Sequence, residues 1–242
     1  MTVETRPAFY ALERGGWRDY VTLLHLPYTA WHLSYVAIGC ALAPVLHADR
    51  LLAALAAFFL ALGVAAHALD ELRGRPLGTA IPRNVLVGLA AVSLAGAVAI
   101  GVASALAWTP WLLAFVAVGG FLVPAYNLEL FGGRFHSDLW FGIAWGAFPV
   151  LTGYFVTAER VDPEAVLAAI AALFLSLAQR QLSTRVRTVR RRVRAVRGTI
   201  VYRDGSEEEI TPGTLTRAPE LALRAMTLGT IALAAALITT HV

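Results

Sequence analysis

The sequence predicts an all-α bundle of about seven membrane-spanning helices, with the N-terminus in the cytoplasm. Hydrophobic residues make up 58% of the 242 residues and charged residues only 15%, whereas soluble proteins average about 25% charged residues. The apolar residues form blocks of the length that a bilayer requires, about 20 residues. The basic residues are all arginine, and they gather in alternate connections between these blocks.

The apolar blocks define the expected spans, at about 21–45, 51–70, 84–107, 109–127, 138–157, 164–180 and 219–239. A tight turn at Trp108-Thr109-Pro110 separates the third span from the fourth. The segment before the first span mixes acids and bases, unlike a signal peptide, so we expect a cytoplasmic lead-in. Gly142 and Gly146 are expected to permit close packing of the fifth span.

The arginines also predict the orientation of the bundle. With the N-terminus inside, 18 of the 20 arginines lie in the cytoplasm, and only Arg50 and Arg160 lie outside. An excess of basic residues is typical of cytoplasmic loops. We therefore expect an integral, multi-pass protein of a prokaryotic plasma membrane.

Two elements are expected in the loop before the last span, both within a single domain of residues 1–242. Residues 181–197 predict a basic amphipathic helix, because apolar residues recur every three or four positions among the arginines. Residues 199–212 predict a β-hairpin around Asp204-Gly205.

The arginines of this loop allow two interpretations. They favour contact with anionic lipid headgroups, or some of them bind a phosphate or diphosphate together with Arg73 and Arg75. Nucleic acid is not an expected partner, because no aromatic or groove-reading module accompanies the arginines. The hairpin offers a surface for a protein partner.

The second span ends in a polar cluster. His67, Asp70 and Glu71 stand at i, i+3 and i+4 and therefore share one helix face. Carboxylates at a helix C-terminus oppose the helix dipole, which favours a ligand or catalytic role. The competing interpretation is that the two acids begin a solvated loop and pair with Arg73 or Arg75.

Further polar residues lie before the fifth span and inside the first. Ser137 or Asp138 is expected to cap the fifth span. His32 lies deep in the first span, where an ionisable residue is a functional hypothesis, although a neutral histidine bonded to a neighbouring helix is commoner. If the inner ends of spans two and five face one pocket, the expected ligands of Mg²⁺, Zn²⁺ or iron are His32, His67, Asp70, Glu71, His136 and Asp138.

Three segments resemble the UbiA superfamily of intramembrane prenyltransferases, and the resemblance extends over roughly residues 18–185. LHLPYTAWHLSYVAIGCALA is similar to the opening helix of that family. DELRGRPLG is similar to its first aspartate-rich motif, and YNLELFGGRFHSDLWFGIAWGAFPVLTGYF to its fourth helix, cytoplasmic loop and fifth helix. The chain departs from the family at Ala66-His67, where members have Asn-Asp, in lacking a second aspartate-rich motif, and in having fewer spans.

The resemblance implies a cavity open to the cytoplasm and to lipid, and a transferase that binds an isoprenoid or lipid diphosphate with Mg²⁺ and alkylates an acceptor. It implies that Asp70 is a metal ligand and Arg75 a diphosphate contact. We accordingly predict catalytic roles for His67, Asp70 and Glu71. The predicted substrate contacts are Arg73, Arg75, Tyr126, Asn127, Arg134 and Arg180.

Two other functions fit the same residues. One is a metal-dependent lipid hydrolase or oxidase, in which Zn²⁺ or iron is held by the cluster His67, Asp70, Glu71, His136 and Asp138. The other is a non-catalytic lipid-binding or assembly protein that docks through its arginine helix and hairpin.

Overall fold

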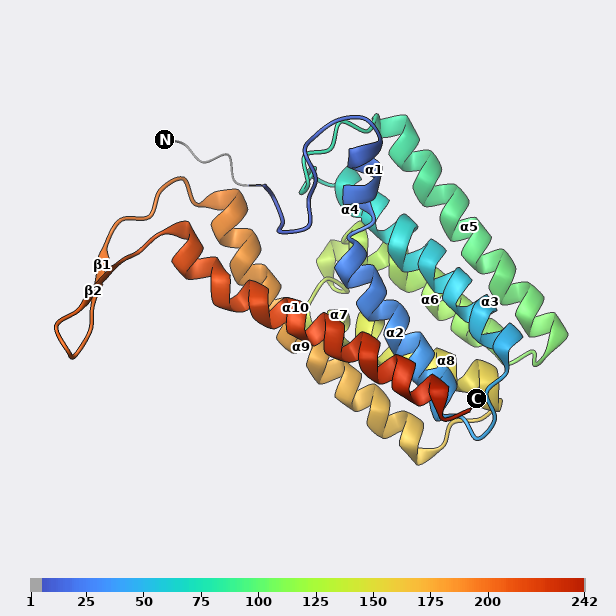
Figure 1. The fold of residues 1–242 in the computed structure, drawn as a ribbon. Coiled ribbons are helices and arrows are strands. Elements are labelled where there is room, and N and C mark those ends of the chain that lie inside the picture. Colours follow the sequence, from blue (N-terminus) through green and yellow to red (C-terminus); the bar gives the residue numbers. More distant parts are fainter. Residues whose placement is uncertain (1–5, 242) are drawn as a thin grey trace.

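The computed structural model describes residues 6–241. Its helices lie side by side in one bundle, and an arm formed by the ends of α9 and α10 projects from the bundle (Figure 1). The chain runs through α1 (Trp17–Leu23), α2 (Leu26–Leu42), α3 (Ala48–Phe58), η1 (Phe59–Ala66), α4 (His67–Leu72), α5 (Arg83–Ala107), α6 (Leu112–Asn127), η2 (Phe131–Gly133), α7 (Asp138–Phe141), η3 (Gly142–Ala147), α8 (Phe148–Ala158), α9 (Pro163–Arg192), β1 (Thr199–Val201), β2 (Glu207–Glu209) and α10 (Pro212–Thr239).

Five helices are long and apolar enough to cross a membrane: Ala48–Leu72, Arg83–Ala107, Asp138–Ala158, Pro163–Arg192 and Pro212–Thr239. The other two expected spans coincide with shorter helices, α2 with 17 residues and α6 with 16. The expectation of an all-α, membrane-type bundle is therefore confirmed. The chain is a membrane-embedded helical protein.

The outer helices expose apolar side chains, as lipid requires. Only 17% of the apolar window of α5 is buried inside the protein. Val92 of α5 is 73% exposed, and Phe174 of α9 and Leu228 of α10 are also largely exposed. In water such surfaces would favour aggregation. In a bilayer they contact the hydrocarbon chains of the lipids.

The centre of the bundle is α2, which packs between α8 and α10. Two glycines bring α2 and α8 into backbone contact, because a Cβ on Gly39 would lie 2.1 Å from the Val150 carbonyl oxygen, and one on Gly153 would lie 2.2 Å from that of Val36. A Cβ on Gly146 would similarly lie 2.6 Å from the Ala172 carbonyl oxygen of α9. Close packing of the fifth span through glycine is thus confirmed.

Two membrane-type helices contain a π-helical stretch. The stretch η1 joins α3 to α4, and η3 joins α7 to α8. π-Helical turns are rare and frequently occur at functional sites. Here η1 ends immediately before His67, and η3 contains Trp145. Both residues line the site described below.

The basic segment differs from the expected separate helix. The helix α9 continues without a break from Pro163 to Arg192 and ends five residues before Arg197. Of the expected apolar stripe, Val186 and Val189 are buried, whereas Val193 follows the helix and is exposed. Strands β1 and β2 then pair as an antiparallel hairpin within 199–212.

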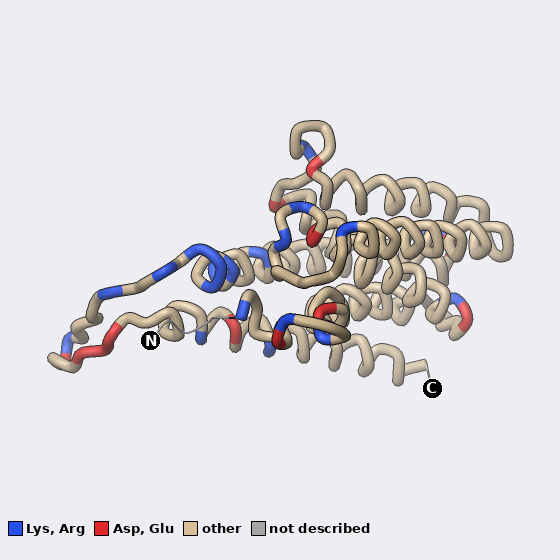
Figure 2. Tube along the Cα trace, turned by 90° about the horizontal axis from the view of Figure 1, so that it is seen from above, with Lys and Arg blue, Asp and Glu red and all other residues tan. Residues whose placement is uncertain are grey.

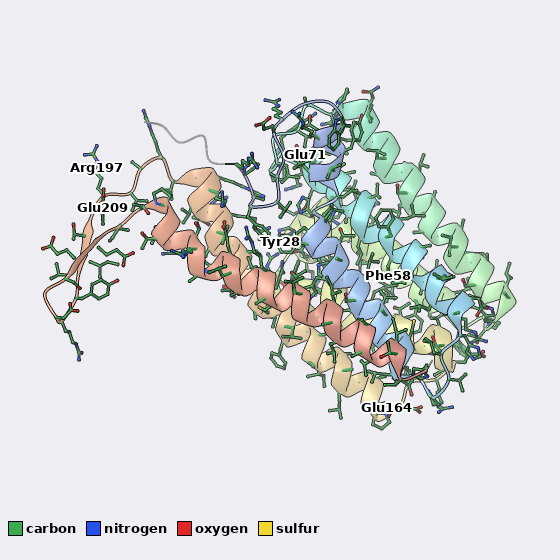
Figure 3. The ribbon with its side chains drawn as sticks, in the orientation of Figure 1. Tyr28, Phe58, Glu71, Glu164, Arg197 and Glu209 are labelled. Atoms are coloured by element: carbon green, nitrogen blue, oxygen red, sulfur yellow. The ribbon has the colours of Figure 1, made fainter. Side chains whose placement is uncertain are left out.

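Charges are concentrated at the two ends of the bundle and on the arm (Figure 2). We call the end that contains the loops 73–82 and 128–137 the polar end, and the end that contains residues 43–47 and 159–162 the opposite end. Glu71 lies at the polar end, beside α1, and Glu164 lies at the opposite end (Figure 3). At the polar end, Ser137 caps α7 by accepting a hydrogen bond from the Trp140 amide, as expected.

Candidate functional site

The polar end of the bundle contains a cavity of about 70 Å³, enough for roughly five water-sized groups. It lies between the start of α2, the junction of η1 with α4, α7, and the middle of α9, and residues 7–10 cover it. We call it the polar chamber. Its principal polar side chains are His25, His32, His67, Asp70, Arg187 and Arg191.

Two of the histidines are fixed by backbone carbonyl groups. His32 Nδ1 lies 2.8 Å from the Trp145 carbonyl oxygen, and His67 Nδ1 lies 3.1 Å from that of Gly63. Because a carbonyl only accepts, each Nδ1 carries the proton and donates it. In the neutral ring this leaves Nε2 with a free lone pair, which is able to accept a proton or contact a ligand.

The third histidine stacks on the second. The rings of His25 and His67 are 4.0 Å apart and inclined by only 12°. The Tyr10 hydroxyl lies 3.0 Å from His25 Nδ1. Burial raises the pKa of Tyr10 far above its usual range, so the hydroxyl keeps its proton and donates to His25. The chain thereby fixes the orientation of all three rings.

Asp70 is the single carboxylate among the described residues that line the polar chamber. It is half-buried, and within residues 6–241 it forms neither a hydrogen bond nor an ion pair. The charges of Arg187, Arg191 and Arg180 act on it electrostatically across the intervening space. Because the Asp70 carboxylate lies near these arginines without contacting them, there is room for a ligand between the carboxylate and the guanidinium groups.

Glu71, the neighbour of Asp70, has a different environment. Its carboxylate is 0% exposed and accepts hydrogen bonds from the Leu77 amide, the Thr79 amide and the Thr79 hydroxyl at 3.0, 2.8 and 2.9 Å. All of these donors belong to the loop between α4 and α5. Glu71 therefore holds that loop, and its predicted catalytic role remains a prediction.

The two arginines of the same loop also make contacts outside the polar chamber. Arg75 donates to the carbonyl oxygens of Thr79 and Ile81 at 3.0 and 2.6 Å. Arg73 donates to Glu129 at 2.7 Å and to the Leu128 carbonyl at 2.8 Å, which links the two loops of the polar end. As folded, both guanidinium groups hold loops in place.

A second cluster lies beside the polar chamber. Arg180 of α9 forms an ion pair with Asp138 and donates to the Tyr126 hydroxyl. Its guanidinium also lies over the Phe141 ring, 5.0 Å from the centroid. Gln181 donates to the other oxygen of Asp138 at 2.8 Å. This cluster joins α6, α7 and α9. Its member Phe141 also lines the polar chamber.

The remaining predicted residues are divided between the chamber and the surface. Asn127 lines the polar chamber and donates to the Val123 carbonyl at 2.7 Å. His136 Nδ1 donates to the Tyr126 carbonyl at 3.0 Å, and the ring acts electrostatically on Asp70. Arg134 is exposed on its loop. Spans two and five thus share one chamber through His67, Asp70, Phe141 and Trp145, while His136 and Asp138 lie outside its lining.

The predicted metal ligands do not converge. Across residues 6–241, no group of three or more histidine, cysteine, aspartate or glutamate side chains is arranged to hold a metal ion. Glu71 is saturated by its loop, and Asp138 is engaged by Arg180 and Gln181. Among the described residues, the six predicted ligands therefore do not form one shared cluster, and binding of Mg²⁺, Zn²⁺ or iron stays a prediction.

Several residues of the polar chamber escaped the sequence-based prediction. Gln179, Arg187 and Arg191 all line the polar chamber from α9. Gln179 is only 4% exposed, and its Oε1 has no hydrogen-bond partner among the described residues. The run of arginines in the sequence indicated a basic site. Only the packing of α9 shows which of these arginines face the polar chamber.

A second cavity, apolar and of about 100 Å³, shares the lining residue Trp145 with the polar chamber. It lies between α3 with η1, α5, α6, and η3 with α8, and its walls are small and aromatic side chains such as Ala57, Gly119, Phe115 and Phe148. We call it the apolar chamber. Trp145 lines both chambers. A polar space and an apolar space that meet at one indole suit a molecule with a polar head and a hydrocarbon chain.

No protein-family model, no curated protein and no solved structure matches this chain. The fold and the site define it as a membrane-embedded helical protein with a basic polar chamber that adjoins an apolar one.

Proposed function

We propose that the protein is a divergent, UbiA-like integral membrane transferase that acts on an isoprenoid or other lipid diphosphate. The observation that carries the proposal is the meeting of the polar and apolar chambers at Trp145. One chamber offers arginine, histidine and a single carboxylate, and the other offers mostly hydrocarbon and aromatic walls, with Ser104 and Thr152 as its polar residues. This division matches the two parts of a lipid diphosphate.

Arg187 and Arg191 would bind the diphosphate, since guanidinium groups form paired hydrogen bonds with phosphate oxygens. The hydrocarbon chain would occupy the apolar chamber. In the transfer, the bond between the allylic carbon and the diphosphate oxygen breaks, and the electron pair leaves with the diphosphate. The two arginines stabilise that leaving charge. Trp145 and Phe141 place aromatic faces near the developing carbocation.

The acceptor then supplies the electron pair for the new bond to the allylic carbon and loses a proton. Asp70, and His67 through Nε2, are the groups of the polar chamber able to take that proton. The acceptor would enter at the open, loop-bearing polar end. Dependence on Mg²⁺ stays a prediction from the resemblance, and the binding experiment is run with and without Mg²⁺ to test it.

The proposal includes seven spans with the polar end in the cytoplasm of a prokaryotic plasma membrane. Its support is the distribution of arginine, with only Arg50, at the start of α3, and Arg160, between α8 and α9, at the opposite end. Basic residues near the inner headgroups also favour anionic lipid contacts. The hairpin remains a proposed docking site for a protein partner.

The test measures binding of farnesyl diphosphate and of inorganic pyrophosphate to purified protein in lipid nanodiscs. Arg187→Gln is expected to weaken binding of both at least tenfold, because it removes a charged contact. Arg185→Gln is the matched control, since Arg185 lies on the same helix but is exposed. Equal affinities of the two variants would contradict the proposed headgroup site.

A second arm tests the apolar chamber. Ala57→Phe fills part of that chamber and is expected to weaken farnesyl diphosphate binding while leaving pyrophosphate binding unchanged. The control is Val92→Phe, on the lipid-facing surface of α5. Binding without transfer to any acceptor would favour the non-catalytic lipid-binding function. Loss of binding of both ligands in Ala57→Phe would contradict the placement of the hydrocarbon chain in the apolar chamber.

A further inference from the structure

The segment Arg6–Leu12 crosses the mouth of the polar chamber. It forms no helix or strand, yet four consecutive residues, Pro7 to Tyr10, line the chamber together with His25, His67 and Asp70. Ala8 and Ala11 are buried, the latter 1% exposed. An irregular N-terminal segment usually lies loosely on the surface, so its burial here needs a specific cause.

The cause is a set of contacts with both walls of the chamber. On the α9 side, Arg190 donates to the Arg6 carbonyl and Arg191 to the Pro7 carbonyl, each at 3.2 Å. On the α2 side, Tyr10 donates to His25 at 3.0 Å. The Phe9 ring also lies under the Arg224 guanidinium of α10, 4.9 Å away. The segment thus bridges elements far apart in sequence.

One of these contacts uses a group that the ligand would need. Arg191 lines the polar chamber, and its Nε–H, a donor suited to a phosphate oxygen, is directed to the Pro7 carbonyl. A backbone carbonyl oxygen carries only a partial negative charge, whereas a phosphate oxygen carries nearly a full one. An anionic headgroup would therefore displace the carbonyl from the arginine in direct competition.

The segment is attached in a way that allows it to swing. It ends at Leu12, whose amide donates to the Thr22 hydroxyl at 3.0 Å. Gly15 and Gly16 follow, with φ of 118° and 60°, and a Cβ on either would meet nothing within 4 Å. Asp19 of α1 accepts from the Gly15 amide and from the Ala80 amide. Two glycines of open backbone conformation thus connect the segment to α1, and one of them is hydrogen-bonded to that helix.

We propose that Arg6–Leu12 is a strap that closes the polar chamber, and that an anionic phosphate headgroup competes with the strap for Arg191. The proposal rests on the proposed function for the identity of the ligand, but closure by the strap does not depend on it. The strap keeps the polar chamber covered until a phosphate-bearing ligand replaces its carbonyl contact. Displacement about the two glycines then opens the polar end to the acceptor.

The test uses full-length protein in nanodiscs, with Ala66→Cys as a reporter within the chamber. Ala66 is 3% exposed and lines the chamber, and the native Cys40 is buried. Tyr10→Phe removes the bond to His25 without changing the volume of the ring. Labelling of the reporter by a small methanethiosulfonate reagent is expected to become about three- to tenfold faster, the effect of losing one hydrogen bond.

The matched control is Tyr202→Phe, which removes a tyrosine hydroxyl that donates to Glu208 on the distant hairpin. A second strap variant, Phe9→Leu, removes the contact with Arg224. It tests whether weakening a different contact of the strap has the same effect as Tyr10→Phe. Both strap variants are also expected to bind inorganic pyrophosphate several-fold more tightly than the wild type, because the competitor has been weakened.

The outcomes separate the strap from the proposed function. Equal labelling rates in the wild type, the strap variants and the control would overturn the strap, whether or not pyrophosphate binds. Faster labelling with unchanged pyrophosphate affinity would overturn the competition for Arg191. Faster labelling in protein that binds neither pyrophosphate nor farnesyl diphosphate would support closure by the strap and would count against the proposed headgroup site.

Discussion

The two ends of the bundle use charged and polar side chains in different ways. At the opposite end, Arg50 pairs with Glu159 at 2.8 Å, donates to the Val156 carbonyl at 3.0 Å and lies over Trp108. Nearby, the Tyr154 hydroxyl lies 2.7 Å from Asp162 and 2.9 Å from Glu164. Arg160 also pairs with Asp162, so these charges have partners that hold helix ends together, whereas Asp49 is exposed.

At the polar end, two polar groups lack such partners. The Asp70 carboxylate forms no hydrogen bond or ion pair within the described part of the chain, and Gln179 Oε1 accepts no hydrogen bond there. Buried polar groups are normally paired, so unpaired ones need an explanation. Trp31, Tyr35 and Ser176 also carry a buried polar atom without a partner among the described residues, but none of them lines the polar chamber. The difference between the ends is therefore one of charge: Arg50 is paired at the opposite end, whereas the Asp70 carboxylate in the polar chamber is not.

Glu71 provides the strongest challenge to this comparison, because it is a fully satisfied carboxylate at the polar end. Glu71→Ala would leave the amides of Leu77 and Thr79 without an acceptor. We expect the free energy of unfolding to fall by about 2–4 kcal/mol, measured by denaturant or thermal unfolding in detergent. Glu13→Gln, an exposed position, is the control. A silent Glu71→Ala would show that satisfied charges at this end do not stabilise the fold.

Arg50 tests the opposite end. Arg50→Ala removes an ion pair, two hydrogen bonds to carbonyl groups and the contact with Trp108. The expected loss is about 1–2 kcal/mol of unfolding free energy, without any change in pyrophosphate affinity. Arg160→Ala serves for comparison, since its pair with Asp162 is more exposed. Weaker pyrophosphate binding in Arg50→Ala would contradict the purely structural role of Arg50 at the opposite end.

Asp70 should show the smallest effect on stability and a large effect on function. Since Asp70 has no hydrogen bond to lose, Asp70→Asn is expected to change the unfolding free energy by less than about 0.5 kcal/mol. Transfer activity should nevertheless fall by at least about 100-fold, the contribution typical of a general base. Unfolding and transfer rates are measured on the same preparation. A large loss of stability would show that the Asp70 carboxylate has a stabilising partner, and Asp70 would then no longer count as an unpaired polar group.

Much of the architecture could be read from single residues and their spacing. The apolar blocks predicted helices at each of the seven positions, and Gly142 and Gly146 predicted close packing that the structure confirms. The basic segment was harder to predict, because the stripe of Leu182, Val186 and Val189 continues in sequence through Val193. The stripe therefore does not indicate where the helix ends, and α9 ends at Arg192 with Val193 exposed.

The candidate site was predictable only in part. His32, His67, Asp70 and Asn127 were singled out and do line the polar chamber. Arg73 and Arg75 were singled out as well, but they hold loops, because a flexible arginine takes whichever carbonyl or carboxylate the fold brings near. Arg187 and Arg191 were hidden among their neighbours, since a run of arginines looks the same from every side until one face is packed.

The sequence by itself determined that this chain is helical and embedded in lipid, because hydrophobicity and span length are properties of each segment alone. It also determined that polar and basic groups collect beyond the apolar blocks. Only the tertiary structure decided which of those groups meet. The stack of His25 on His67, the strap over Arg191 and the contact of two chambers at Trp145 all depend on how separate helices are rotated against one another, and that rotation is set by packing across the whole bundle.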